Sequence, residues 1–207
     1  MNKIILIILV LFTGNFSTFA GDHLNLLSEE FCYKSPKVQV IDGQYYFFNQ
    51  ELPYSGENLC VYSKSGQYHS KGQILNGKRE GWWSLWLDNV AGVWRKEKYE
   101  DGNLARETHF TYFDNGQQKS EVSYKKSKAN GNWFFWNENG GALKKEQYEN
   151  GNLVKETHFT YFNNGQKKSE VNFKDGQLDG EVTSWNENGR ALKKEQYENG
   201  NLVKETH

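Results

Sequence analysis

The sequence predicts an all-β protein, an elongated antiparallel β-meander of tandem hairpin repeats. Of its 20 glycines, 12 follow Asn or Asp. Asn-Gly and Asp-Gly are strong signals for the type I′ turn of a two-residue hairpin, because both turn residues require a positive φ. Residues 109–157 and 158–206 are identical at 35 of 49 positions. A repeat this strong indicates the architecture before any local propensity does.

The first 20 residues have the layout of a secretory signal peptide. A basic start at Lys3 precedes the apolar run from Ile4 to Phe12, and small residues follow at Ala20 and Gly21. The alternative is an uncleaved membrane anchor, but the apolar run is too short to span a bilayer comfortably. We therefore expect an exported protein, periplasmic or secreted, with no transmembrane segment after cleavage.

Residues 21–53 lack the repeat and are expected to form a short N-terminal cap. The chain has two cysteines, Cys32 and Cys60. Export to an oxidising compartment favours a disulfide between them, which would tie the cap to the first repeats. The alternative is two unpaired thiols.

Residues 54–207 are expected to be tandem hairpin units of about 24 residues. The first series of turn glycines is Gly116, Gly140, Gly165 and Gly189, and the second is Gly102, Gly151, Gly176 and Gly200. Ser127 stands where the second series expects a further glycine. A unit with two strands is too small to bury a core alone, so stability must come from the stacking of neighbours.

Aromatic residues precede the turns and are interpreted as a structural spine. Three positions ahead of the second series the rings are Tyr99, Tyr124, Tyr148, Phe173 and Tyr197. We expect each ring to pack across strands on the equivalent ring of its neighbour. Charged strings such as 144–146 and 193–195 are expected on exposed strand faces.

Composition and spacing argue against several function classes. The net charge of −1, with signs that alternate along the chain, lacks the basic face that nucleic acids require. Two cysteines cannot build a structural zinc site, and we expect no metal and no cofactor. His109, His158 and His207 recur in one Glu-Thr-His slot, which indicates a repeated strand position. No catalytic residue is predicted, so we expect no enzymatic activity.

Binding residues are sought among the aromatics that do not recur. Trp82, Trp83, Trp133 and Phe135 are the candidates, because Val182 and Ser184 occupy the slots of the last two in the next unit. Since strand residues alternate between faces, Trp133 and Phe135 should lie opposite Phe134 and Trp136. An accessible set of rings would serve either a protein partner or the sugar rings of a cell-wall glycan.

Several segments resemble the bacterial MORN-repeat variant family. The leader is Asp42-Gly43-Gln44-Tyr45-Tyr46 followed by Pro53-Tyr54-Ser55-Gly56. The repeat itself stands in residues 76–83, in residues 131–146 and again from Gly180 to Glu195. The resemblance covers about residues 41–207.

The resemblance implies a protein that binds another protein, since members of the family are described as antitoxin or immunity components of bacterial toxin modules. The expected function is therefore an exported repeat protein with an immunity or scaffold role. The alternative is a carbohydrate or cell-wall binding module. The lipid binding of the shorter eukaryotic MORN repeats is not expected here, because the sequence shows no basic stripe for anionic headgroups.

Overall fold

The computed structural model describes residues 30–32, 38–62, 65–88 and 92–207. The predicted signal peptide, residues 1–20, and the start of the cap lie outside the described residues. The described part of the chain is all-β and contains no helix, as predicted. No helix in this part is therefore long and apolar enough to cross a membrane.

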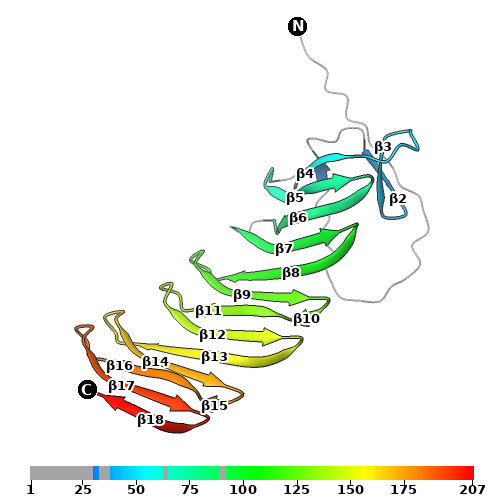
Figure 1. The fold of residues 1–207 in the computed structure, drawn as a ribbon. Coiled ribbons are helices and arrows are strands. Elements are labelled where there is room, and N and C mark those ends of the chain that lie inside the picture. The colour runs from blue at the N-terminus through cyan, green and yellow to red at the C-terminus, as the bar shows by residue number, and fades with distance from the viewer. Residues whose placement is uncertain (1–29, 33–37, 63–64, 89–91) are drawn as a thin grey trace, which may run out of the picture.

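Sixteen strands form one antiparallel sheet, and from β4 onward its main path follows the order of the strands in the sequence (Figure 1). The main path consists of β1 (Glu30–Cys32), β4 (Gly56–Tyr62), β5 (Tyr68–Leu75), β6 (Lys78–Trp86), β7 (Val93–Glu100), β8 (Asn103–Tyr112), β9 (Gln118–Lys125), β11 (Gly131–Trp136), β12 (Ala142–Glu149), β13 (Asn152–Tyr161), β14 (Lys167–Lys174), β16 (Gly180–Trp185), β17 (Ala191–Glu198) and β18 (Asn201–Thr206). The short strands β10 (Lys128–Ala129) and β15 (Gln177–Leu178) extend β9 and β14. The predicted meander is confirmed.

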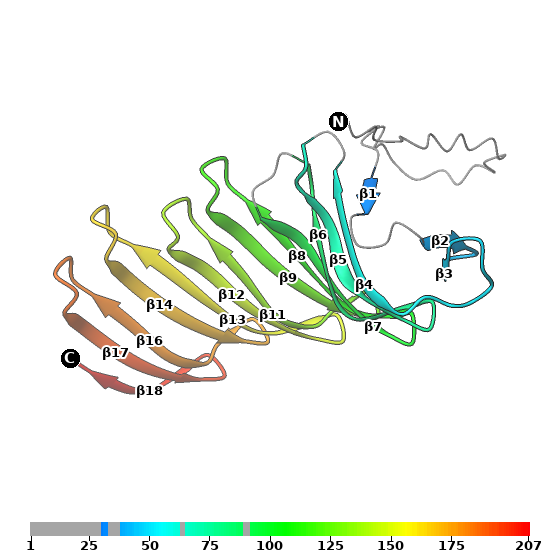
Figure 2. The same ribbon diagram turned by 90° about the horizontal axis from the view of Figure 1, so that it is seen from above.

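A second sheet of two strands lies beside the start of the main sheet (Figure 2). It contains β2 (Val38–Ile41) and β3 (Gln44–Phe47). The backbone amide of Tyr45 donates to the carbonyl of Gly77 at 2.9 Å, and the amide of Gly77 donates to the carbonyl of Tyr54 at 2.8 Å. These bonds fix the small sheet to the turn between β5 and β6. Within the predicted cap region, β1 instead joins the main sheet by pairing with β4.

Six of the twelve Asn-Gly and Asp-Gly pairs have the predicted type I′ backbone, with a positive φ at both residues. In the first series, at Gly116, Gly140, Gly165 and Gly189, only the glycine has a positive φ, so the type I′ prediction is wrong there. Asn76 has φ 49° and Gly77 has φ 77°, the paired positive values of a type I′ turn. At the opposite strand ends the loops are longer, as where the amide of Gly116 donates to the carbonyl of Phe113 at 2.9 Å. The register shifts between Lys98 and Tyr99 and again between Gln147 and Tyr148. Because bulges increase local twist, their regular recurrence explains the progressive turning of the sheet in Figure 2.

The sheet has two faces, which we name after two adjacent tryptophans. The register places Trp83, Glu97 and Glu107 on the Trp83 face, and Trp82, Lys98 and Arg106 on the Trp82 face. Most side chains in this single layer are only half-buried. Among the described residues, the buried apolar side chains are Cys60, Val61, Tyr62, Ile74 and Trp83. The core therefore lies in β4 to β6.

Cys60 is in this core at 3% exposure and is disulfide-bonded. The backbone register places Cys32 directly opposite it, between β1 and β4. Residues opposite each other in antiparallel strands have Cα atoms about 4.5–5.5 Å apart, which suits a disulfide. Cys32 is the only other cysteine in the sequence.

Candidate functional site

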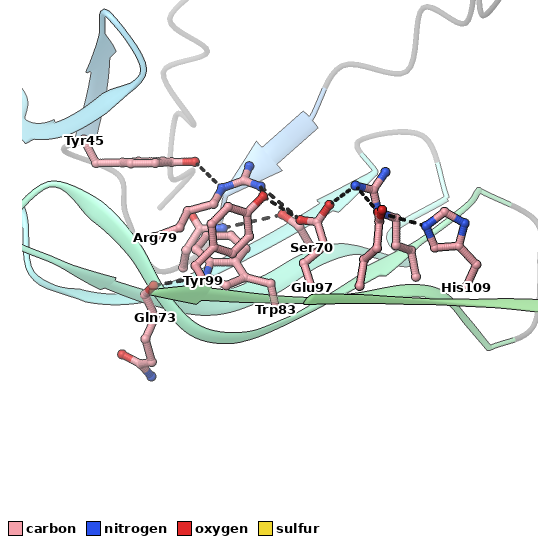
Figure 3. Close-up of polar contacts among 11 residues, drawn as sticks. Tyr45, Ser70, Gln73, Arg79, Trp83, Glu97, Tyr99 and His109 are labelled. Atoms are coloured by element: carbon pink, nitrogen blue, oxygen red, sulfur yellow. Dashed lines mark hydrogen bonds and ion pairs between the residues drawn. The ribbon is translucent and has the colours of Figure 1, made fainter. Parts of the chain in front are cut away.

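A network of polar side chains crosses the Trp83 face at its N-terminal end, with Arg79 at its centre (Figure 3). Arg79 Nε donates to Tyr45 Oη at 3.2 Å, and Nη1 donates to Tyr99 Oη at 3.0 Å. The guanidinium lies over the Trp83 ring, 4.4 Å from its centroid. Arg79 also pairs with Glu97, with 3.4 Å between Nη1 and Oε2. Because Tyr45 is in β3 of the small sheet, its hydrogen bond with Arg79 joins the small sheet to the main sheet.

The network continues along the Trp83 face through Glu97, whose side chain is buried. Tyr99 donates to Glu97 Oε2 at 2.8 Å, and Arg95 Nη2 lies 2.6 Å from Glu97 Oε1. The same Arg95 atom is 2.9 Å from Glu107 Oε2, which in turn is 3.0 Å from His109 Nε2. Burial of a carboxylate is costly unless it is paired, and here cations and a hydroxyl compensate for it.

This arrangement of a cation, two glutamates, a tyrosine and a histidine recurs with the 49-residue period. In the second copy, Lys144 Nζ is 2.6 Å from Glu146, Tyr148 donates to Glu146 at 3.2 Å, and His158 is 2.8 Å from Glu156. The third copy contains Lys193, Glu195, Tyr197, Glu205 and His207. Repetition indicates that the arrangement is part of the scaffold.

Glu146 corrects one expectation about the charged strings. An exposed face is predicted for the string 144–146, but Glu146 is only 5% exposed. Successive strand residues alternate, so Lys145 faces solvent while Lys144 and Glu146 share the Trp83 face. The carboxylate is buried because Lys144 and Tyr148 satisfy it.

Arg79 is the singular member of the network. It follows a type I′ turn at the slot that holds Leu104, Ala129, Leu153, Leu178 and Leu202 in the later units. A leucine there needs no partner, whereas Arg79 requires Tyr45, Tyr99 and Glu97. We attribute the exchange to the small sheet, because Tyr45 approaches the main sheet at this end (Figure 3).

The protonation of the network favours stable pairing. Burial lowers the pKa of Arg79, but the nearby Tyr45 and Tyr99 outweigh it, so the pKa stands above its ordinary value. Burial, followed by the hydrogen bond to Glu97, raises the pKa of Tyr99. Burial and the charge of Glu146 raise the pKa of Tyr148 in the same way. At neutral pH these tyrosines are protonated donors, which orders the face without providing a base.

The aromatic spine exists, but its contacts differ from those expected. Tyr124 and Tyr148 do not stack on each other directly, because Trp133 lies between them, with centroids at 5.3 and 4.3 Å. His109 packs on Tyr124 at 5.4 Å, and His158 packs on Phe173 at 5.1 Å. The recurring histidines are thus rings of the spine as well as partners of glutamate.

The structure separates the four predicted binding residues. Trp83 is 0% exposed, lies against Gly72 and donates from Nε1 to the carbonyl of Gln73 at 3.1 Å, so no ligand reaches it in this structure. Trp82 is on the other face and is 55% exposed. Trp133 is half-buried in the spine and donates to the carbonyl of Ser123 at 2.8 Å.

Phe135 is also half-buried on the Trp83 face, with Lys144 Nζ 5.0 Å from its ring centroid. Phe134 and Trp136 lie on the opposite face, where their rings stack at 5.7 Å. The alternation predicted for this strand therefore agrees with the register. Of the four candidates, Trp82 has the most accessible ring.

The Trp82 face combines half-buried rings with lysines. Lys96 Nζ is 5.5 Å from the Phe110 centroid, and Lys145 Nζ is 5.7 Å from that of Phe134. Lys167 approaches both Phe159 and Trp185, at 5.0 and 5.4 Å. Such cation–π contacts hold extended lysines against the sheet and cover part of each ring.

A hollow of about 580 Å³ lies where the small sheet meets the main sheet. Its walls include Tyr45, Lys78, Arg79, Tyr99 and Asp101. Two of these residues, Tyr45 and Tyr99, direct their hydroxyls to Arg79. Among the described residues, no group of three or more His, Cys, Asp or Glu side chains is arranged to hold a metal ion.

Sequence reasoning missed the network around Arg79 and the opposed glutamates Glu97 and Glu107. The glutamates recur in sequence at 49-residue intervals, and this was a usable signal. Their meeting depends on the strand register, which places Glu97 directly opposite Glu107. Tyr45 gave no comparable signal, since it lies outside the repeats.

The fold and the recurring network define a β-hairpin repeat protein. The profile of the MORN repeat variant family matches two adjacent stretches, residues 142–160 and 157–175. The first covers the hairpin of β12 and β13, and the second reaches the end of β14. Residues 191–207 repeat the sequence of 142–158 without change. MORN-like hairpins therefore account for the architecture of this region.

No match to a curated protein is found. Among solved structures, the crystal structure of TarM is similar at 12% sequence identity over 69% of this chain and 22% of that chain, with a TM-score of 0.23. The present chain thus spans about a fifth of that protein. A TM-score of this size does not establish a shared fold.

Proposed function

We propose that this protein is an exported, non-enzymatic repeat protein that presents its sheet to a protein partner. The observation that carries the proposal is the single-layer sheet, which leaves side chains of both faces accessible along its length. Fourteen strands on the main path, about 4.8 Å apart, extend over roughly 60 Å. A long surface with few enclosed groups suits recognition of another macromolecule better than turnover of a small substrate.

The local chemistry supports binding over catalysis. The histidines and glutamates of the Trp83 face are paired within each repeat, and the tyrosines are held protonated. A catalytic group is normally singular and placed near a reacting atom. Arg79, the member of the network that does not recur, is engaged by the two sheets that it joins.

The finer proposal is an immunity-like or envelope scaffold role outside the cytoplasm. Its test is co-expression of the chain with the product of each adjacent gene, followed by affinity purification and mass measurement of the complex. A stoichiometric complex that survives gel filtration is the expected result. Fractionation should find the mature chain, beginning at Gly21, outside the cytoplasm. The proposal fails if no encoded neighbour binds and the full-length chain stays in the cytoplasm.

Glycan binding is the second candidate, and the rings of the Trp82 face favour it. Phe134 and Trp136 stack there, and Trp82 is exposed. A glycan array and a peptidoglycan pull-down would test this candidate with wild-type protein and with Trp82→Ala. Saturable binding that Trp82→Ala abolishes would favour a carbohydrate module, and the absence of binding would exclude the glycans tested. Trp82 suits this test better than Trp133, because replacement of Trp133 would also remove its packing in the aromatic spine.

A further inference from the structure

Cations stand directly opposite one another on neighbouring strands of the Trp82 face. Lys98 in β7 pairs with Arg106 in β8, and Arg106 pairs with Lys125 in β9. Lys125 pairs in turn with Lys128 in β10. We call these four residues the basic row. Arg106, Lys125 and Lys128 are exposed, and Lys98 is half-buried.

Such a row is unfavourable for the fold. Like charges placed directly opposite each other destabilise a sheet, whereas opposite charges stabilise it. Glu100 is the acidic neighbour of the row, 2.9 Å from Lys98. The hydrogen bond and charge of Lys98 lower the pKa of the Glu100 carboxyl, and Arg106 and Lys125 lower it further. The Glu100 carboxylate therefore neutralises only a minor part of the positive charge of the four cations.

The scaffold does not require the full row. In the next period Lys155 and Lys174 keep the central pair of cations, but Gln147 takes the slot of Lys98 and Gln177 takes that of Lys128. The strand pairing is nevertheless the same, with Gln147 opposite Lys155. The complete row is therefore particular to the first period. Because it opposes stability without a role in pairing, its presence points to a role in binding.

An exposed aromatic ring adjoins the row. Trp82 in β6 pairs directly with Lys98, and its side chain is 55% exposed. The equivalent residues in the later units are Asn132 and Glu181. An exposed tryptophan at the end of four cations provides one apolar anchor beside a line of positive charge, and Trp is enriched among the residues that dominate binding energy.

We propose that the basic row and Trp82 bind an acidic, extended segment of a protein partner. The inference rests on the proposed function and specifies the partner's chemistry. The cations lie on successive strands about 4.8 Å apart, so the row is roughly 15 Å long, and about five extended residues span it. The row is a single line of cations with the Glu100 carboxylate beside Lys98, so its positive field is narrow. A narrow field suits a single strand of carboxylates better than the broad anionic surface of a membrane or a duplex.

The test uses the full chain and a fluorescein-labelled peptide of about eight residues, rich in Glu with one central Leu, measured by fluorescence anisotropy. The wild type is expected to bind the Glu peptide and not its Gln counterpart. The row variant should weaken binding at least about tenfold, since three charge contacts are lost. Trp82→Ala should weaken it by roughly threefold with the salt dependence retained. The row variant carries Lys98→Gln, Arg106→Gln and Lys125→Gln.

The matched control removes the same charge from the same face in the later periods. It should change peptide affinity by less than about twofold, because its cations lie one or more periods away and are screened. Thermal unfolding gives a second readout: the row variant should be no less stable than wild type, since like-charge repulsion is removed. The control carries Lys155→Gln, Lys174→Gln and Lys204→Gln.

Three results would overturn the inference. These are equal losses from the row and control variants, no binding of the Glu peptide at millimolar concentration, and tighter row-dependent binding of anionic vesicles or single-stranded nucleic acid. A stoichiometric protein partner that binds wild type and the row variant equally would also refute the inference, but it would leave the proposed function standing. Failure of every protein partner would count against the proposed function instead.

Discussion

The turn between β9 and β10 consists of Lys126 and Ser127. The other turns of the second glycine series have glycine at the position of Ser127. Lys126 has φ 50° and Ser127 has φ 59°. A left-handed conformation costs a residue with a Cβ about 1–2 kcal/mol. The greater freedom of glycine in the unfolded chain costs about 0.5–1 kcal/mol. The difference predicts that Ser127→Gly raises the free energy of unfolding by about 0.5–1 kcal/mol.

Packing contributes little to this prediction. Ser127 is exposed. At the equivalent Gly176, an added Cβ would meet no atom within 4 Å, so the exchange of Ser and Gly is conformational. Urea denaturation followed by tryptophan fluorescence gives the free energy, and thermal unfolding should shift upward by about 1–4 °C for a chain of this length.

Two controls isolate the cause. Ser127→Ala keeps a Cβ in the left-handed region and should stay within about 0.5 kcal/mol of wild type. Gly176→Ser should lose about what Ser127→Gly gains, because it introduces the same strain in the next period. If Ser127→Gly and Ser127→Ala have equal free energies of unfolding, backbone strain in this turn is not the determinant and the reasoning is refuted.

Three further predictions concern the N-terminal end. Gly72→Ala should destabilise the protein by about 1–3 kcal/mol in denaturant titrations, because the added Cβ would overlap the buried Trp83 ring. Stability should be constant up to about pH 10 and fall above it as Tyr99 ionises, since a raised folded-state pKa favours the protonated form. Tyr99→Phe should flatten that fall. Reduction of the Cys60 disulfide should cost about 2–4 kcal/mol, measured by unfolding with and without reductant.

Each of these three predictions has a result that would contradict it. A Gly72→Ala protein of wild-type stability, with unchanged near-ultraviolet circular dichroism, would show that Trp83 has room to shift. An alkaline loss of stability identical in wild type and Tyr99→Phe would assign it to other groups. Equal unfolding curves with and without reductant, once thiol labelling shows Cys60 to be reduced, would remove the proposed contribution of the disulfide.

The sequence predicted the fold well because its strongest signals act locally. Asn76-Gly77 selects a turn geometry by itself, and the recurring glycines set the strand lengths without any knowledge of tertiary contacts. Even the exception at Ser127 was visible as a break in the series, although its positive φ was not.

The site was harder to predict because its residues lie on different strands, and only the pairing register of those strands brings them together. The near-neutral net charge conceals the basic row, which depends on Lys98, Arg106 and Lys125 standing opposite each other. Trp83 and Trp82 are adjacent and chemically identical, yet Trp83 is buried over Gly72 and Trp82 is exposed. A glycine inside a strand, which permits close approach, was the available clue.

The 49-residue period allows the sheet to become longer or shorter without a change in how its strands pair. Removal of residues 109–157 would join Thr108 to His158, which reproduces the existing junction of Thr157 and His158. Each main-path strand between those points pairs with its neighbours on the path, so the strands that remain would pair without a gap. Gain or loss of one period would add or remove four strands of the main path, about 19 Å. Homologues should therefore differ in length by whole periods while keeping the small sheet and Arg79 at one end.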